Sequence, residues 1–443
     1  MRRTVLLLTA LLLGALSLSP ASRADVGPGG FMSPNVKWLG HIPIDFPGVG
    51  GRVVTVNGSP RLYVTGMKGL SIYDLSNPTL PLLMGTAVVP HYQNEDVEVS
   101  DDGATVFITE DSGYSPCATC GFLYVIDASI PQAPIVRSVL QNTSHTVSCA
   151  DAHCEWLYAS TGQTYDVRDR AHPVIAPAGW ADGLTFRQRP HNLNRDAVGL
   201  VVTDSVPRYI VDPRTDPAHP TLVNTSPVSP DDHLAYQHGN LRPDADRYVP
   251  RAAGDDDPAL RAGELLLAGG ETNETVQCDG TTNGPFATWS MVNFDKGTAM
   301  KPLDVYRPLK NGTWDNGDPA INVLGCSTHW FTERGGIVAA GWFEHGTRFL
   351  KVDPTTGHIT EVGFFQPVWG SASAAYWIND STVAVVDYGR GVDILSFDRN
   401  AATPTQAQID QSWLAKLHAA PVAAAEAEKW ACRLALTSGK AAA

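Results

Sequence analysis

Basic side chains are scarce in this chain of 443 residues, which has 32 Lys and Arg against 46 Asp and Glu and a formal net charge of −14. A surface with this balance repels phosphate backbones, because like charges face each other across the contact. We therefore expect no nucleic acid among the partners of this protein.

The sequence also lacks a hydrophobic run of the roughly 20 residues that are needed to span a bilayer. Its longest apolar run follows Arg2 and Arg3 and precedes a small-x-small pattern at Ser22 and Ala24. These features are typical of an export signal. We expect residues 1–24 to be a cleaved signal peptide, and the mature chain to be secreted, extracellular and without a transmembrane anchor.

Common catalytic signatures are missing as well. The chain has no G-x-S-x-G nucleophile elbow, no glycine-rich phosphate loop and no Cys–His nucleophile pairing. Any active site must therefore be sought in another arrangement of side chains.

Cysteine is present in a number, seven, that suits an oxidising compartment. Six of the seven fall into candidate disulfide pairs, namely Cys117 with Cys120, Cys149 with Cys154, and Cys278 with Cys326. The spacing does not fix the connectivity, and Cys432 is left over. Cys117 and Cys120 could instead form a redox or metal pair, although no thioredoxin-like strand–helix pattern surrounds them.

What the sequence has in abundance is a repeated pattern of short strands. A strand that ends in small or acidic residues, such as 61–66 or 199–204, precedes one with Asp near its end, such as 69–74. The pattern occurs seven times, and each copy opens with one further strand and closes with another. Four-stranded units of about 40–50 residues are typical of β-propeller blades. We predict an all-β, seven-bladed β-propeller over residues 25–400.

The two ends of the array predict how the ring closes. The seventh unit lacks its fourth strand, whereas residues 37–45 form an orphan strand that resembles the fourth strands of other units. We expect this N-terminal strand to complete the last blade and so to remove two exposed sheet edges. Residues 401–443 are rich in Ala and predict a helical or partly disordered tail.

Two of the units, LSIYDLSNPTLPLLMGT and LYVIDASIPQAPIVRSV, resemble the LVIVD repeat of exported bacterial propellers. The resemblance covers about residues 37–400, and it implies the propeller fold without implying an activity. More distantly, the arrangement is similar to the selenium-binding and methanethiol oxidase propellers, which carry a His-rich metal site.

Seven positions align at the start of the first strand of each unit, namely Arg52, Asp96, His145, His191, His238, His329 and Ser373. The first strand of every blade lines the central channel, so these residues should meet at one mouth of it. Four of them are His, in a chain with 13 His in all. We predict that the four imidazoles bind a transition metal, Cu, Fe or Zn.

Acidic residues should surround this site. The loops after the second strands carry Glu110, Asp111, Asp204, Glu271, Glu274, Glu344 and Asp387, which we expect to form an acidic rim. Asp96 and Glu95 are candidate catalytic acids or bases. Arg52 is a third catalytic candidate, because it could pair with Asp96 or hold an anionic substrate.

Each His could instead have a structural role, as a donor to a carbonyl group of the neighbouring blade. Two functions therefore stay open. The first is a monomeric metal-dependent oxidoreductase or hydrolase that acts on a small molecule. The second is a non-catalytic extracellular propeller that binds a small ligand or another protein in the same funnel.

Other polar residues have simpler interpretations. We expect the Asp of the third strand in each unit, as in Asp74, Asp127, Asp212 and Asp353, to cap a turn. We expect His172, His219 and His358 to lie exposed in the turns that follow.

Overall fold

The computed structural model describes residues 30–42, 48–66, 69–89, 96–110, 121–141, 144–228, 237–255, 257–271, 284–307, 327–343, 345–367, 370–405 and 407–408. Several sequence predictions lie outside these residues. They are the signal peptide, nearly all of the C-terminal tail, and the residues Glu95, Asp111, Cys117, Cys120, Glu274, Cys278, Cys326 and Glu344.

The described strands form seven antiparallel sheets, which we call blades 1 to 7 in chain order. Blade 1 consists of β3 (Gly48–Val56), β4 (Ser59–Gly66), β5 (Gly69–Asp74) and β6 (Leu82–Val88). Blade 2 consists of β7 (Val97–Val99), β8 (Thr105–Glu110), β9 (Phe122–Asp127) and β10 (Ile135–Gln141). Blade 3 consists of β11 (Val147–Cys149), β12 (Trp156–Ala159), β13 (Thr164–Asp166) and β14 (Val174–Ile175). Blade 4 consists of β15 (Leu193–Arg195), β16 (Val201–Thr203), β17 (Tyr209–Asp212) and β18 (Thr221–Thr225).

The remaining blades follow the same order. Blade 5 consists of β19 (Gln237–Leu241), β20 (Leu265–Gly270), β21 (Phe286–Ser290) and β22 (Lys301–Tyr306), with the 3-10 turns η1 (Ala245–Arg247) and η2 (Phe294–Lys296) in its loops. Blade 6 consists of β23 (Phe331–Arg334), β24 (Ile337–Gly341), β25 (Thr347–Val352) and β26 (Ile359–Pro367), with β1 (Gly30–Met32) added outside. Blade 7 consists of β27 (Ala372–Asn379), β28 (Thr382–Asp387), β29 (Gly391–Phe397) and β2 (Val36–Ile42).

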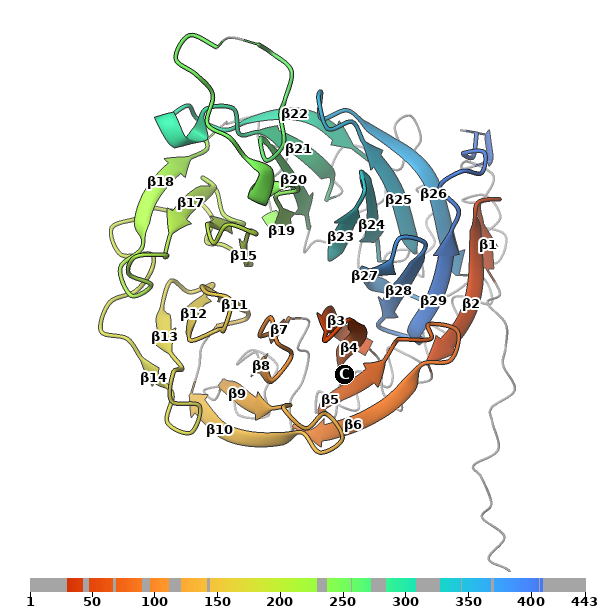
Figure 1. Cartoon of the computed structure of the whole chain (residues 1–443), viewed down its shortest axis with the longest axis horizontal. Coiled ribbons are helices and arrows are strands. Elements are labelled where there is room, and N and C mark those ends of the chain that lie inside the picture. The colour runs from red at the N-terminus through yellow and green to blue at the C-terminus, as the bar shows by residue number, and fades with distance from the viewer. Residues whose placement is uncertain are drawn as a thin grey trace, which may run out of the picture.

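The blades stand in a ring with the first strand of each nearest the centre (Figure 1). This confirms the prediction of an all-β, seven-bladed propeller. Among the described residues, no helix is long and apolar enough to cross a membrane.

The N-terminal segment supplies the outermost strand of two neighbouring blades. β2 pairs with β29, with Val36 opposite Phe397, and β1 pairs with β26, with Phe31 opposite Gln366. The sequence pattern predicts a single N-terminal strand, so β1 is a second strand that was not expected. Both strands lie on the outer side of the ring (Figure 1), where they cover edges that would otherwise expose backbone groups.

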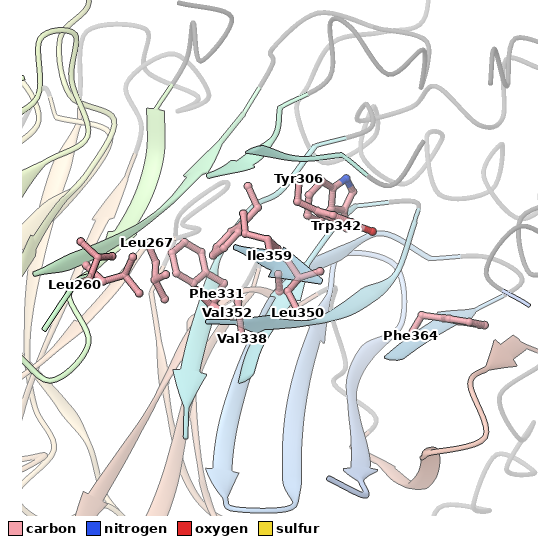
Figure 2. Close-up of a cluster of buried hydrophobic side chains, with 13 residues drawn as sticks. Leu260, Leu267, Tyr306, Phe331, Val338, Trp342, Leu350, Val352, Ile359 and Phe364 are labelled. Atoms are coloured by element: carbon pink, nitrogen blue, oxygen red, sulfur yellow. The ribbon is translucent and has the colours of Figure 1, made fainter. Parts of the chain in front are cut away.

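The core lies between the faces of adjacent blades. Figure 2 shows the cluster between blades 5 and 6, which includes Leu267, Phe331 and Trp342. The rings of Phe286 and Phe331 meet edge to face with centroids 5.0 Å apart. Both side chains are at least 90% buried, and each contributes about 1.5–3 kcal/mol through its burial. Rigid contacts of this kind fix the position of each first strand beside the channel.

The third-strand Asp residues cap turns, as predicted. The backbone N–H groups of Ser76, Ser129, Arg214 and Thr355 donate to the carboxylates of Asp74, Asp127, Asp212 and Asp353. His172, His219 and His358 are exposed, also as predicted.

Replacing Asp127 by Ala should lower the free energy of unfolding by about 1 kcal/mol, because the Ser129 N–H, 2.9 Å from Asp127 Oδ1, loses its acceptor. Asp127→Asn is the matched control, because its amide oxygen can still accept this bond while the ion pair with Arg137 is lost. Urea denaturation measures the free energy of unfolding of both variants and of the wild type. Equal losses in the two would show that the charge, and not the turn, is what matters.

Candidate metal centre

The four predicted His side chains come from the channel ends of blades 3 to 6. His145, His191 and His329 each stand two residues before a first strand, and His238 lies within β19. Hydrogen bonds hold their backbone within and between blades. The Thr146 hydroxyl donates to the His191 carbonyl, and the His329 N–H donates to the Gly341 carbonyl at 2.9 Å. The positions of the imidazoles are therefore set by the ring itself.

The structure brings the four imidazoles together in an arc that follows the blade order. Ring centroids are 4.7 Å apart for His145 and His191, 4.1 Å for His191 and His238, and 4.0 Å for His238 and His329. His191, His238 and His329 are buried, and His145 is half-buried at one end of the arc. Three buried imidazoles in contact are a strong concentration of nitrogen donors.

Glu271 supplies a carboxylate to this arc. It follows β20, and its oxygens lie 3.9 Å from His238 Nε2 and 4.0 Å from His329 Nε2. One ligand atom each from His191, His238 and Glu271 lie within 4.8 Å of one another. In a tetrahedral site with bonds of about 2.1 Å the ligand atoms are about 3.4 Å apart, so these groups need to close by at most about 1.4 Å around an ion.

The orientation of His329 is fixed by a second partner. Its Nδ1 lies 2.7 Å from the Ser373 carbonyl oxygen, which can only accept, so Nδ1 carries the proton. In a neutral imidazole the lone pair is then on Nε2, the atom that faces Glu271. Metal-binding His residues commonly use the second nitrogen in this way. His329 thus has the structural role considered above, donation to a carbonyl group of the neighbouring blade, while its Nε2 can still act as a ligand atom.

Three of the acids predicted for the acidic rim are buried. Glu110, Asp204 and Asp387 are each no more than 2% exposed, so they do not present an accessible carboxylate. The reason is local pairing. Asp204 Oδ1 lies 2.8 Å from Arg208 Nη1, and its other oxygen accepts from Asn240 at 2.9 Å. Burial raises the pKa of Asp204 to about 6, although Arg208 acts in the opposite direction.

Arg52 and Asp96 have partners that were not expected. Arg52 Nη1 donates to Glu98 Oε1 at 3.0 Å, so its ion-pair partner is Glu98 and not Asp96. Glu98 is the main cause that raises the pKa of Arg52, with a smaller contribution from Asp96. Asp96 Oδ2 accepts from the Val147 N–H at 3.1 Å and thereby links blades 2 and 3. The catalytic roles of Arg52, Asp96 and Glu95 stay predictions.

An apolar cluster lies next to His329, at the end of the arc opposite His145. Val49, Phe343 and Tyr388, from blades 1, 6 and 7, pack together and are buried. The Phe343 ring lies 4.7 Å from the His329 ring, and the Tyr388 ring lies 6.2 Å from it. Sequence reasoning missed this cluster, since no repeated residue type marks it.

One predicted disulfide is confirmed. Cys149 at the end of β11 is bonded to Cys154, with Cα atoms 4.7 Å apart. This bond closes the connection between β11 and β12 in blade 3, whose first strand follows His145.

Comparisons with known proteins support the fold alone. No family model and no curated protein matches the sequence, so the resemblance to the LVIVD repeat stays a prediction. Among solved structures, the β-propeller domain of Cps50 (Swd1) from Myceliophteria thermophila has a TM-score of 0.53 at 11% identity, with 82% of this chain and 100% of that chain covered. A putative 6-phosphogluconolactonase from Bacteroides fragilis has a TM-score of 0.52 at 12% identity, with 80% and 92% covered. The chain is thus similar in architecture to propellers of quite different description.

Proposed function

We propose that this protein is an exported β-propeller that binds one transition-metal ion at the axial mouth of its ring. The observation that carries the proposal is the set of ligand atoms from His191, His238 and Glu271 within 4.8 Å. His329 adds a further nitrogen, because its Nε2 lies 4.0 Å from Glu271. The His145 ring lies 4.7 Å from the ring of His191, the outermost member of this set, so His145 borders the centre.

The donor chemistry favours Zn, Cu or Fe. Imidazole nitrogens with one carboxylate oxygen are the ligands of many zinc and non-haem iron sites, and Cu also accepts imidazole readily. Neutral imidazoles with one carboxylate have a total charge of −1, so a dication leaves the site with a charge of only +1. The burial of His238 and His329 keeps competing water away from the centre.

A bound ion of this kind would supply Lewis acidity or electron transfer, which suits the oxidation or hydrolysis of a small molecule. The residues of the chain would bind and orient it: His329 through its bond to Ser373, and Glu271 from the end of β20. The half-buried His145 leaves one side of the arc accessible.

Metal analysis tests the proposal directly. The full chain, loaded separately with Zn²⁺, Cu²⁺ and Fe²⁺ and freed of excess ion, should retain about one ion per chain with at least one of the three. The His191→Ala, His238→Ala double variant and Glu271→Gln should each lose most of it, measured by elemental analysis.

His172→Ala is the matched control, because His172 is exposed and lies away from the arc. It should retain the wild-type metal content, and circular dichroism should show that every variant is folded. A wild-type chain that holds none of the three ions after loading, or a double variant that keeps its ion, would contradict the proposal.

A further inference from the structure

The residue Phe343 has an unusual backbone conformation beside the candidate metal centre. Its φ is +41°, in the left-handed region that favours glycine and is rare for an aromatic residue. A conformation of this kind costs about 1–3 kcal/mol, and it persists only where the surroundings impose it. Such residues cluster at ligand-binding sites, so the position of the Phe343 ring needs a functional account.

Three backbone hydrogen bonds impose this conformation. The Phe343 N–H donates to the Ala372 carbonyl at 3.0 Å, and the Phe343 carbonyl accepts from the N–H groups of Ala372 at 2.9 Å and Gly346 at 3.0 Å. Ala372 begins β27, so the bonds tie the end of blade 6 to blade 7. The ring is thereby held at a fixed place next to His329.

The Phe343 ring continues the lining of the candidate centre with apolar groups on the side of His329. It is 4.7 Å from the His329 ring and 6.3 Å from the Tyr388 ring, and Val49 completes the cluster. The His arc and Glu271 thus form one side of the site, and this apolar cluster extends the site beyond His329. A ligand that spans both would have a polar end and an apolar end.

The arginine side chains of the neighbouring strands are already paired. Arg52 is bound to Glu98, Arg208 to Asp204, and Arg390 to Asp393. An anionic ligand would have to compete with these carboxylates, and it would also meet Glu271 itself. The charge distribution therefore disfavours a carboxylate or phosphate at the apolar end of a ligand.

We propose that the site takes a small neutral molecule whose polar end meets the metal ion and whose apolar end packs on Phe343 and Tyr388. This inference rests on the proposed metal centre and specifies its substrate class. Arg52, considered from the sequence as a partner for an anionic substrate, has no part in it, because a neutral molecule brings no charge for the guanidinium to bind, and Arg52 Nη1 already donates to Glu98.

Two hydroxamates that differ only in their tails test the inference. Benzohydroxamate and succinate monohydroxamate bind metals through the same group but carry a phenyl ring and a carboxylate, respectively. Isothermal titration into the full chain, loaded with the ion that it retains best, should show that benzohydroxamate binds about tenfold tighter or more. Metal content is measured on the same samples.

The Phe343→Gly variant removes the ring while allowing the left-handed backbone, so it should fold and retain its metal. Its preference for benzohydroxamate should fall to less than about threefold. His172→Ala is the control, because His172 is exposed in an outer turn of blade 3, and it should keep the wild-type preference.

The outcomes separate the two proposals. A wild-type chain that holds its metal but binds both hydroxamates equally, or an undiminished preference in Phe343→Gly, overturns the neutral-ligand inference and leaves the metal centre standing. A wild-type chain that holds no metal overturns both.

Discussion

Replacing Arg208 by Met should lower the free energy of unfolding by about 3–5 kcal/mol at pH 8. Arg208 and Asp204 are 1% and 0% exposed in their side chains, with Nη1 and Oδ1 2.8 Å apart. Removing the guanidinium leaves the carboxylate buried with Asn240 but without its cation. Met fills similar volume, so the loss reports on charge more than on packing.

The pH dependence of this loss identifies its cause. Burial already raises the pKa of Asp204 to about 6, and removing Arg208 should raise it further. Because the folded state then prefers the protonated acid, the penalty should be present at high pH and should shrink as the pH falls toward 5. Urea denaturation at pH 5 and pH 8 measures the difference.

The double variant Arg208→Met, Asp204→Asn is the control. It removes both charges, so it should recover most of the stability that the single variant loses. A single variant that loses less than about 1 kcal/mol at pH 8 would show that the pair has little net effect on stability.

Replacing Asp393 by Asn should cost about 2–3 kcal/mol near neutral pH, the second-largest loss that we expect. Its buried carboxylate accepts from Trp38 Nε1 and His41 Nδ1, each at 3.0 Å, and lies 3.0 Å from Arg390 Nε. Trp38 and His41 belong to β2, whereas Asp393 belongs to β29. This side chain therefore strengthens the backbone pairing that holds β2 to β29 in the last blade.

The same residue should make the protein sensitive to acid. Burial alone would raise the pKa of Asp393, but hydrogen bonds from His41 and Arg390 outweigh it and lower the pKa to about 2. Since the value in the unfolded chain is near 3.8, the stabilisation is complete above about pH 4 and is lost as the pH falls through 2. This contribution is worth about 2 kcal/mol.

Thermal unfolding between pH 1.5 and 7 tests this prediction. The difference in midpoint between the wild type and Asp393→Asn should be largest above pH 4 and small near pH 2. Asp380→Asn is the matched control, because Asp380 also pairs with an arginine, Arg334, but is largely exposed. A difference that did not change with pH would mean that the carboxylate charge is irrelevant to stability.

The fold could be predicted because the same order of short strands and turns recurs seven times in the sequence. Alternating apolar strands and capped turns recur at a regular spacing, and only a closed ring uses all of them. The same regularity placed the four imidazoles, since equivalent positions of successive blades must meet at the axis. Their contact therefore follows from periodicity, without any knowledge of the loops.

Pairings within the site could not be predicted in the same way. Glu271 was expected at the rim, yet its oxygens lie 3.9 Å from His238 Nε2 and 4.0 Å from His329 Nε2, because their position depends on how the chain turns after β20. Arg52 reaches Glu98 and not Asp96, and these two acids are only two residues apart in the sequence. Such choices depend on ångström-scale geometry that residue spacing does not contain.

The backbone conformation of single residues could not be predicted from the sequence either. A left-handed backbone is normally marked by glycine, and nothing marks Phe343, because hydrogen bonds to Ala372 from another blade impose it. Likewise, Asp204 was predicted for the acidic rim, although it is buried and paired with Arg208, only four residues later in the sequence.

The two N-terminal strands also order the folding of the ring in time. β1 and β2 pair with β26 and β29, more than 300 residues away, with Phe31 opposite Gln366 and Val36 opposite Phe397. During synthesis these strands exist long before the strands that receive them. Contacts of such high sequence separation form slowly, because the whole intervening chain must first be ordered. We therefore expect the seam at blades 6 and 7 to form last, with the outer edges of β26 and β29 unpaired until β1 and β2 reach them.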